Sequence, residues 1–132
     1  MKYLFDTNVC IYILKGKSLT LKEKLQSIPN EQIVIPSIVR FELFYGAYKS
    51  STSQKTLTLL TEFLNSFSTI NFDDIMAKKA GEIRASLDKS GTPIGPYDLI
   101  IAATAIISKL ILISSNTREF KRINEILIED WY

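Results

Sequence analysis

The stretch that decides the fold is Lys2-Tyr3-Leu4-Phe5-Asp6-Thr7-Asn8, followed by Val9-Cys10-Ile11-Tyr12-Ile13-Leu14. Its apolar run over 3–5 does not alternate with polar residues, which is typical of a short strand buried on both faces of a parallel sheet. The run stops at Asp6, and helical spacing begins at the next residue. Ligands of open α/β sheets bind beyond the carboxyl ends of the strands. Asp6 is therefore a candidate site residue, and equally a candidate N-cap of the following helix.

Composition predicts one globular domain over residues 1–132. The chain is 46% hydrophobic and 23% charged, which is ordinary for a folded protein in water. We find no apolar run near the ~20 residues of a membrane span, and no signal-peptide pattern at the N-terminus. The one cysteine, Cys10, stands among apolar residues and excludes an intramolecular disulfide. We expect a core role for it and a cytoplasmic protein.

The chain has no histidine. This excludes Ser-His-Asp and Cys-His catalysis and almost every catalytic zinc site. Carboxylates must then carry any polar chemistry, alone or through a hard cation such as Mg²⁺ or Mn²⁺. The net charge of +2 does not by itself indicate nucleic acid. If four carboxylates hold a metal, 16 basic residues face 14 − 4 = 10 acidic ones, which leaves room for a polyanionic substrate.

Short apolar runs alternate with helical patterns along the rest of the chain. After the first strand we expect four more, at 33–35, 69–72, 110–114 and 126–128. Helices are expected over 7–14, 18–27, from Ser37, from about 53 to 67, over 75–90 and over 96–107, with Gly16 ending the first. The alternation predicts an α/β fold with a mostly parallel sheet of about five short strands, covered by helices on both faces.

Glu42 falls on an apolar stripe of its predicted helix. The i, i+3, i+4, i+7 positions from Ile38 are Phe41, Glu42 and Tyr45. Burying an unpaired carboxylate costs several kcal/mol, so its place there needs a reason. The alternatives are a salt bridge to an arginine and a site residue, and we favour the site residue.

Three more polar positions follow the same logic. Asp98 lies in the first turn of the most apolar predicted helix. It is the third residue of that helix, counted from Pro96, where the helix dipole favours an anion. Asn116 and Glu119 follow the strand at 110–114 with the spacing of a capping box, so capping and catalysis are both open for Glu119. For the pair Asp73-Asp74 we favour N-capping of the next helix.

Right-handed crossovers bring successive strand ends to one edge of a sheet, so these carboxylates can converge. Several carboxylates this close raise one another's pKa unless a cation neutralises them. One or two Mg²⁺ or Mn²⁺ ions would do so, and would activate water against a phosphodiester.

Four segments in this order resemble PIN-domain ribonucleases, and more closely the VapC toxins of bacterial type II toxin–antitoxin pairs. They are LFDTN with Asp6, SIVRFELFYGA with Glu42, GTPIGPYDLIIAATA with Asp98, and LILISSNTREF with Asn116 and Glu119. The resemblance runs from end to end. It implies a PIN-like three-layer α/β/α fold and an acidic catalytic site of Asp6, Glu42, Asp98 and Glu119.

The resemblance also assigns further roles. Asp6 and Asp98 would be the main metal ligands, with Thr7, Asn8, Asn116 and Thr117 as supporting polar residues. The implied substrate is structured RNA, often tRNA or ribosomal RNA loops. The implied partner is a VapB-type antitoxin, in a hetero-oligomer with a homodimer of this chain, and DNA would be bound only through the antitoxin. For RNA binding we expect the basic residues beside the site, namely Lys15, Lys17, Arg118, Lys121 and Arg122.

Two other functions fit parts of the pattern. A receiver-like phosphoacceptor module has similar layering, but it needs a lysine after its last functional strand, where this chain has Asn116. It also leaves Glu42 without a role. A flap-type DNA nuclease shares the metal chemistry, but this chain has no residues to spare for a helical arch.

Overall fold

The computed structural model describes residues 1–132 and contains a four-stranded, fully parallel sheet. The strands are β1 (Tyr3–Phe5), β2 (Ile33–Val34), β3 (Ile111–Ile113) and β4 (Ile128–Glu129), in the spatial order β2-β1-β3-β4. Tyr3 is paired with Ile33 on one side and Ile111 on the other. The first strand of the chain therefore lies inside the sheet, and its end is flanked by the ends of β2 and β3.

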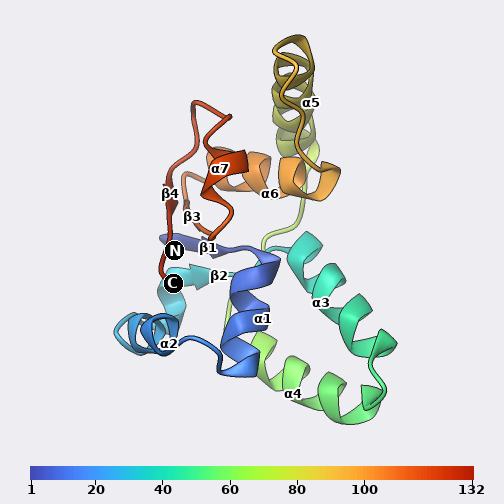
Figure 1. Cartoon of the computed structure of the whole chain (residues 1–132), viewed down its shortest axis with the longest axis vertical. Helices are drawn as coiled ribbons and strands as arrows, with labels where there is room; N and C mark the ends of the chain where they lie inside the picture. The colour runs from blue at the N-terminus through green and yellow to red at the C-terminus, as the bar shows by residue number, and fades with distance from the viewer.

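Helices cover the sheet on both sides, as the three-layer α/β/α prediction requires. The helical elements are α1 (Thr7–Lys15), α2 (Leu19–Gln26), the 3-10 turn η1 (Asn30–Gln32), α3 (Ser37–Lys49), α4 (Ser53–Asn65), α5 (Asp74–Lys89), α6 (Pro96–Ile107) and α7 (Thr117–Phe120). In Figure 1, α5, α6 and α7 lie above the strands and α1 to α4 lie below them. None of these helices is long and apolar enough to cross a lipid bilayer.

The helix ends follow the local sequence signals. Asp6 caps α1 through a 2.9 Å bond from the backbone N–H of Val9 to its Oδ1, and Asp73 caps α5 in the same way. Gly16 ends α1 in the left-handed region at φ 62°, which costs glycine little. Pro96 is the first residue of α6, as predicted.

The core is built from the central strands and α6. Leu4, Phe5, Leu112 and Ile113 are fully buried, and six residues of α6 are buried, as expected for a helix that is apolar nearly all round. Trp131 packs edge-on against the rings of Tyr3 and Phe5 at centroid distances of 4.9 and 5.7 Å. The burial of α6 in this core fixes the helix, and with it the place of Asp98.

The strand predicted at 69–72 is not formed. Only Ser68 bridges to β2, and the following residues run on as an extended, largely exposed segment. The backbone N–H groups of Ile35 and Ser37 donate to the carbonyls of Ser68 (3.0 Å) and Ile70 (2.9 Å), so backbone pairing continues over a short distance without a full strand. The Arg40 guanidinium also holds the start of this segment, donating to the carbonyls of Ile35 (2.9 Å), Phe67 (3.1 Å) and Ser68 (3.2 Å). The last predicted strand is also displaced, since β4 begins at Ile128.

The buried face of α3 differs from the predicted stripe. Val39, Leu43 and Ala47 face the core, whereas Phe41 and Tyr45 are exposed. Glu42 therefore lies beside the buried face and is only partly covered. The error arose because the aromatic residues of α3 exceed what its buried face can hold.

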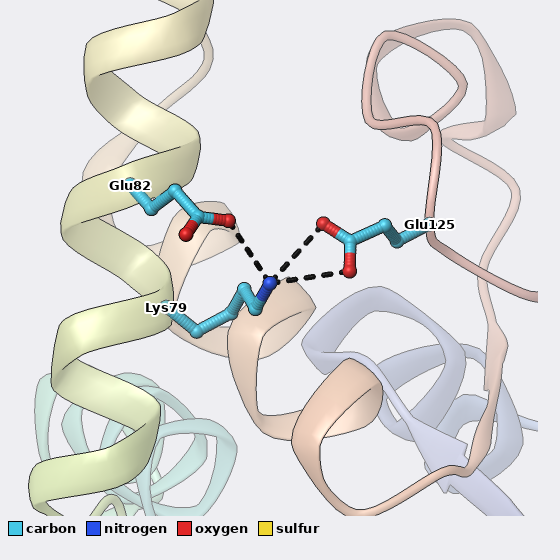
Figure 2. A network of polar contacts seen from close by, with 3 residues as sticks. All are labelled: Lys79, Glu82 and Glu125. Atoms are coloured by element: carbon cyan, nitrogen blue, oxygen red, sulfur yellow. Dashed lines mark hydrogen bonds and ion pairs between the residues drawn. The ribbon is translucent and has the colours of Figure 1, made fainter.

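A polar network ties α5 to the segment after α7. Figure 2 shows Lys79 Nζ between Glu82 on its own helix, at 3.0 Å, and both carboxylate oxygens of Glu125, at 3.1 and 3.2 Å. These are the only salt bridges in the structure. None of the candidate site carboxylates takes part in one.

Candidate active site

Asp6 stands where β1 passes into α1. The pairing of Phe5 with Ile113 places it beside Ser114, the residue after β3, and its backbone N–H donates to the Ile113 carbonyl at 3.3 Å. The side chain is 6% exposed. Burial raises the pKa of Asp6, with a contribution from the charge of Glu42, while hydrogen bonds from Ser114 and the Val9 N–H oppose the rise. The N-cap and site roles are thus compatible, since the cap uses only Oδ1.

Glu42 reaches the same edge of the sheet from α3. Its Oε1 accepts a 2.8 Å hydrogen bond from Thr7 Oγ1, one residue beyond Asp6. It makes no salt bridge, and Arg40, two residues earlier, spends its donors on backbone carbonyls. The salt-bridge explanation for Glu42 therefore fails, and its charge is left without a basic partner.

Asp98 lies in the first turn of α6, half-buried above the same edge. Its pKa is raised from 3.8 to about 6, first by burial, then by the charge of Glu119 and a hydrogen bond between the two carboxyl groups, and further by Asp6 and Glu42. Asp98 therefore lies within electrostatic range of the other three predicted acidic residues.

Asn116 and Glu119 do not form the capping box that their spacing allows. The Asn116 side chain makes no cap to α7, and its Nδ2 donates instead to Glu119 Oε2 at 2.8 Å. The backbone N–H of Asn116 donates to Ser114 Oγ at 2.9 Å, which fixes the turn after β3. The amide thus orients a carboxylate toward Asp98, and Glu119 is free of a backbone-capping role.

The other predicted residues are spread more widely. Thr7 and Thr117 are partly buried at the starts of α1 and α7, and Asn8 is exposed on α1. The five predicted RNA-binding residues are all exposed, but α1 carries Lys15 and Lys17 away from the acidic edge, as Figure 1 shows. Arg118, Lys121 and Arg122 lie on or after α7, beside Glu119. Of these, Arg122 also donates to the Pro93 carbonyl at 2.9 Å, in the loop before α6.

Two side chains that the sequence did not single out lie at this edge. Ser114 is fully buried and contacts Asp6. This neighbour follows from the pairing register of β1 and β3, which the sequence alone does not give. The Tyr132 hydroxyl is buried with no hydrogen-bond partner. Burial, opposed by the nearby Ser115 hydroxyl and reinforced by the Asp6 charge, raises its pKa to about 12. No local pattern predicts that position.

Two hollows of about 530 and 520 Å³ lie on the molecule, one lined by residues between Ile111 and Glu129 and the other between α2 and the segment 129–132. Neither of them is lined by any of the four acidic residues.

The donor chemistry of this edge fits a divalent cation. Burial raises the pKa of Asp98, and the charges of Glu119, Asp6 and Glu42 add to this, while none of the four carboxylates has a basic partner. Oxygen donors of this kind are the ligands of Mg²⁺ and Mn²⁺. No three of them are close enough here to hold one ion together, so the side chains would have to move to bind one.

Comparison with known proteins places the chain in a family. The PIN domain model matches residues 3–126. The tRNA(fMet)-specific endonucleases VapC of Shigella flexneri and Salmonella typhimurium are 35% and 38% identical to it over 131 residues, covering 99% of this chain and 98% of each relative. Two solved structures are also similar, the DNA-bound VapBC of Salmonella typhimurium (TM-score 0.94, 38% identity, 100% of this chain and 99% of that one) and the VapBC2 of Rickettsia felis bound to promoter DNA (TM-score 0.93, 34% identity, 100% of both chains).

The chain belongs to the PIN-domain family, and within it to the VapC ribonucleases. The resemblance found in the sequence is confirmed, as is the PIN-like fold, with four strands where about five were expected. PIN-domain nucleases are generally dependent on divalent metal ions, in keeping with the donor set described above.

Proposed function

We propose that residues 1–132 form one PIN domain that acts as the toxin of a type II toxin–antitoxin pair, an endoribonuclease that hydrolyses phosphodiester bonds in structured RNA. The substrate class would be tRNA or ribosomal RNA loops. The observation that carries the proposal is the set of four carboxylates at one sheet edge, without a single basic partner among them. Such a set is unfavourable without a cation and a reaction to use it.

Mg²⁺ or Mn²⁺ is the cofactor we infer, with Asp6 and Asp98 as its main ligands and Glu42 and Glu119 completing the acidic site. A bound divalent cation would activate water and stabilise charge developing on the scissile phosphate. The chain's own residues prepare the place. Thr7 orients Glu42, and Asn116 orients Glu119.

Asp98 carries a proton at low pH in this scheme. Burial, and then its acidic neighbours, raise the pKa of Asp98 to about 6, so below that pH the carboxyl group is protonated. As a ligand of a divalent cation Asp98 would have to be ionised, so it would first have to give up this proton. Above about pH 6 Asp98 is already ionised and meets this requirement.

RNA would be held by the basic residues around the site. Arg118, Lys121 and Arg122 are exposed beside Glu119, so they can contact phosphates near the cut. Lys15 and Lys17 stand at the far end of α1 and would contact a more distant part of a folded RNA. The arrangement supports a substrate longer than a few nucleotides.

Control would come from a VapB-type antitoxin in the cytoplasm. The α3–α4 hairpin exposes Phe41, Tyr45 and Tyr48 and half-exposes Phe44, which gives an apolar segment of the antitoxin a surface to cover. An arginine or lysine of the antitoxin could then enter the acidic cluster and neutralise it by charge-assisted hydrogen bonds. We also propose a homodimer of this chain within the complex, with DNA bound only through the antitoxin.

The activity is tested by incubating the purified chain with total RNA, and with an initiator tRNA transcript, in Mg²⁺, Mn²⁺ or EDTA. We expect discrete cleavage in either metal and none in EDTA, and none from Asp6→Asn, which keeps the volume but removes a charge. Equal cleavage in EDTA, or by Asp6→Asn, would contradict the proposal.

The antitoxin mechanism has its own test. The cognate antitoxin is co-expressed and its basic residues are replaced one at a time, with binding and inhibition measured separately. We expect one replacement to restore cleavage. If inhibition survives the loss of every basic residue, the site is blocked by bulk and the charge mechanism is wrong.

A further inference from the structure

Two exposed aromatic rings meet directly beside the acidic site. Phe41 on α3 and Tyr97 on α6 pack edge-to-face, with centroids 5.9 Å apart and an angle of 82° between the rings. Phe41 immediately precedes Glu42, and Tyr97 immediately precedes Asp98. The two helices that position these carboxylates thus also join this aromatic pair.

The packing of the two rings against each other does not account for how much of each ring is exposed. Phe41 is 52% exposed and Tyr97 is 45% exposed, so much of each ring remains in contact with water. In an edge-to-face arrangement one ring offers its rim to the other's face, which leaves ring faces free for a third flat group. Neither residue belongs to the hydrophobic core.

The position of the rings is set by helix geometry. Successive residues on an α-helix point about 100° apart, because the helix has 3.6 residues per turn. The Phe41 and Glu42 side chains therefore point in different directions from α3, and the same holds for Tyr97 and Asp98 on α6. The aromatic pair thus joins the two helices next to the carboxylates without being formed by them.

RNA needs an additional contact to reach the buried part of the site, and the aromatic pair can supply one. Asp6 is 6% exposed, so a backbone phosphate of RNA has to bend inward to come near it. RNA loops are recognised largely by bases that leave their stack and are taken up by aromatic side chains. A base next to the bent phosphate loses its neighbour, and a free ring face beside the site can replace it.

We propose that Phe41 and Tyr97 form a stacking platform for a base that flanks the scissile phosphate, and so position the RNA for cleavage. This inference rests on the proposed ribonuclease function. The platform is a positioning device, because its rings contact the substrate away from the reacting atoms. The platform can stack on the flat face of any base, so it does not select a base by its identity. It contributes to the choice of cut site because the flanking base must be one that can leave its stack.

The experiment combines protein variants with altered RNA. The cut in an initiator tRNA transcript is first mapped with the wild-type chain, and the RNA is then remade with an abasic residue on either side of the cut. For the wild type we expect one abasic position to reduce single-turnover cleavage roughly five- to a hundredfold. Phe41→Leu and Tyr97→Leu should show a similar loss on intact RNA, and little further loss on abasic RNA.

Conservative and distant variants serve as controls. Tyr97→Phe and Phe41→Tyr keep a ring and should behave as wild type. Tyr48→Leu alters a more exposed aromatic residue on α3, about 10 Å further along the helix from Phe41, and should keep the full abasic penalty. RNA binding in EDTA, followed by fluorescence anisotropy, gives a readout that does not depend on cleavage, and should weaken only in the two leucine variants.

The outcomes separate this inference from the proposed function. If the wild type neither binds nor cuts RNA, the ribonuclease proposal fails. If the wild type cuts RNA and the leucine variants bind and cut it equally well, only the platform is wrong. Loss of antitoxin binding or a changed oligomeric state in those variants, with RNA binding intact, would assign the rings to a protein interface and overturn the platform.

Discussion

Asp98 makes stability and activity depend on pH in opposite directions. Its pKa of about 6 in the folded chain lies above the ordinary 3.8, because burial and its acidic neighbours disfavour the charge. The folded state therefore binds the proton more tightly than the unfolded state. Asp98 thus contributes stability below about pH 4, and this is lost as the pH rises through about 6.

We expect the melting temperature in EDTA to fall between pH 4 and pH 7, and to fall less in Asp98→Asn, which cannot ionise. The buried Asp6, whose pKa is also raised, accounts for part of the remaining slope. Mg²⁺-dependent cleavage by the wild type should rise over the same range. Identical pH slopes of stability in the two proteins would contradict the placement of Asp98 among carboxylates.

Glu42→Gln separates function from stability. The glutamine keeps an oxygen that can accept the Thr7 hydroxyl, but it removes a negative charge from the cluster. Stability in EDTA should hold or increase, while cleavage falls about ten- to a hundredfold or more. Chemical denaturation and single-turnover cleavage measure the two effects. A large loss of stability would indicate a structural role instead.

The positions of Asp6 and Asp98 could be predicted from the sequence because each stands at a recognisable element boundary. Asp6 follows a strand, and Asp98 follows Pro96 at a helix start. Ser114 and Tyr132 could not be predicted, since their places depend on the pairing of β1 with β3 and on the course of the final segment. Both depend on contacts between residues far apart in the chain, which a local sequence pattern does not predict.

At the level of elements, Arg40 joins the start of α3 to the segment after α4. Its guanidinium donates to the carbonyls of Ile35, Phe67 and Ser68. We expect Arg40→Leu to reduce the free energy of unfolding by about 2–4 kcal/mol, because the partly buried carbonyls of Ile35 and Phe67 lose charge-assisted bonds. Urea denaturation measures the loss, with Arg84→Leu on the exposed face of α5 as the matched control. Equal effects in both variants would show that the network contributes nothing.

The two errors in predicting elements have one physical origin. The run at 69–72 and the aromatic stripe of α3 are both apolar enough to be core, yet both lie where the core is already filled. The sheet ends at β2, and the buried face of α3 is complete with Val39, Leu43 and Ala47. Periodicity reports which side chains could be buried, whereas available volume decides which are.

Across the whole molecule, the proposed path of the RNA can be tested by removing the exposed basic residues in pairs. Lys15→Gln with Lys17→Gln removes charge at the end of α1, and Arg118→Gln with Lys121→Gln removes it beside α7. Removing one phosphate-binding charge should reduce the slope of log affinity against log salt by roughly one unit. Lys55→Gln with Lys89→Gln, also exposed, is the control and should leave the slope unchanged. A pair of site variants with an unchanged slope would place the RNA path elsewhere.

The pairing of β1 with β3 has a consequence for how the protein is made. Tyr3 pairs with Ile111, which is synthesised 108 positions later, and this pairing sets Asp6 beside Ser114. A nascent chain that lacks β3 therefore lacks the assembled acidic site. Under the proposed function, the RNA around the ribosome would meet no complete site until β3 has emerged. Long-range closure of this kind is slow, which would give a freshly made antitoxin time to bind first.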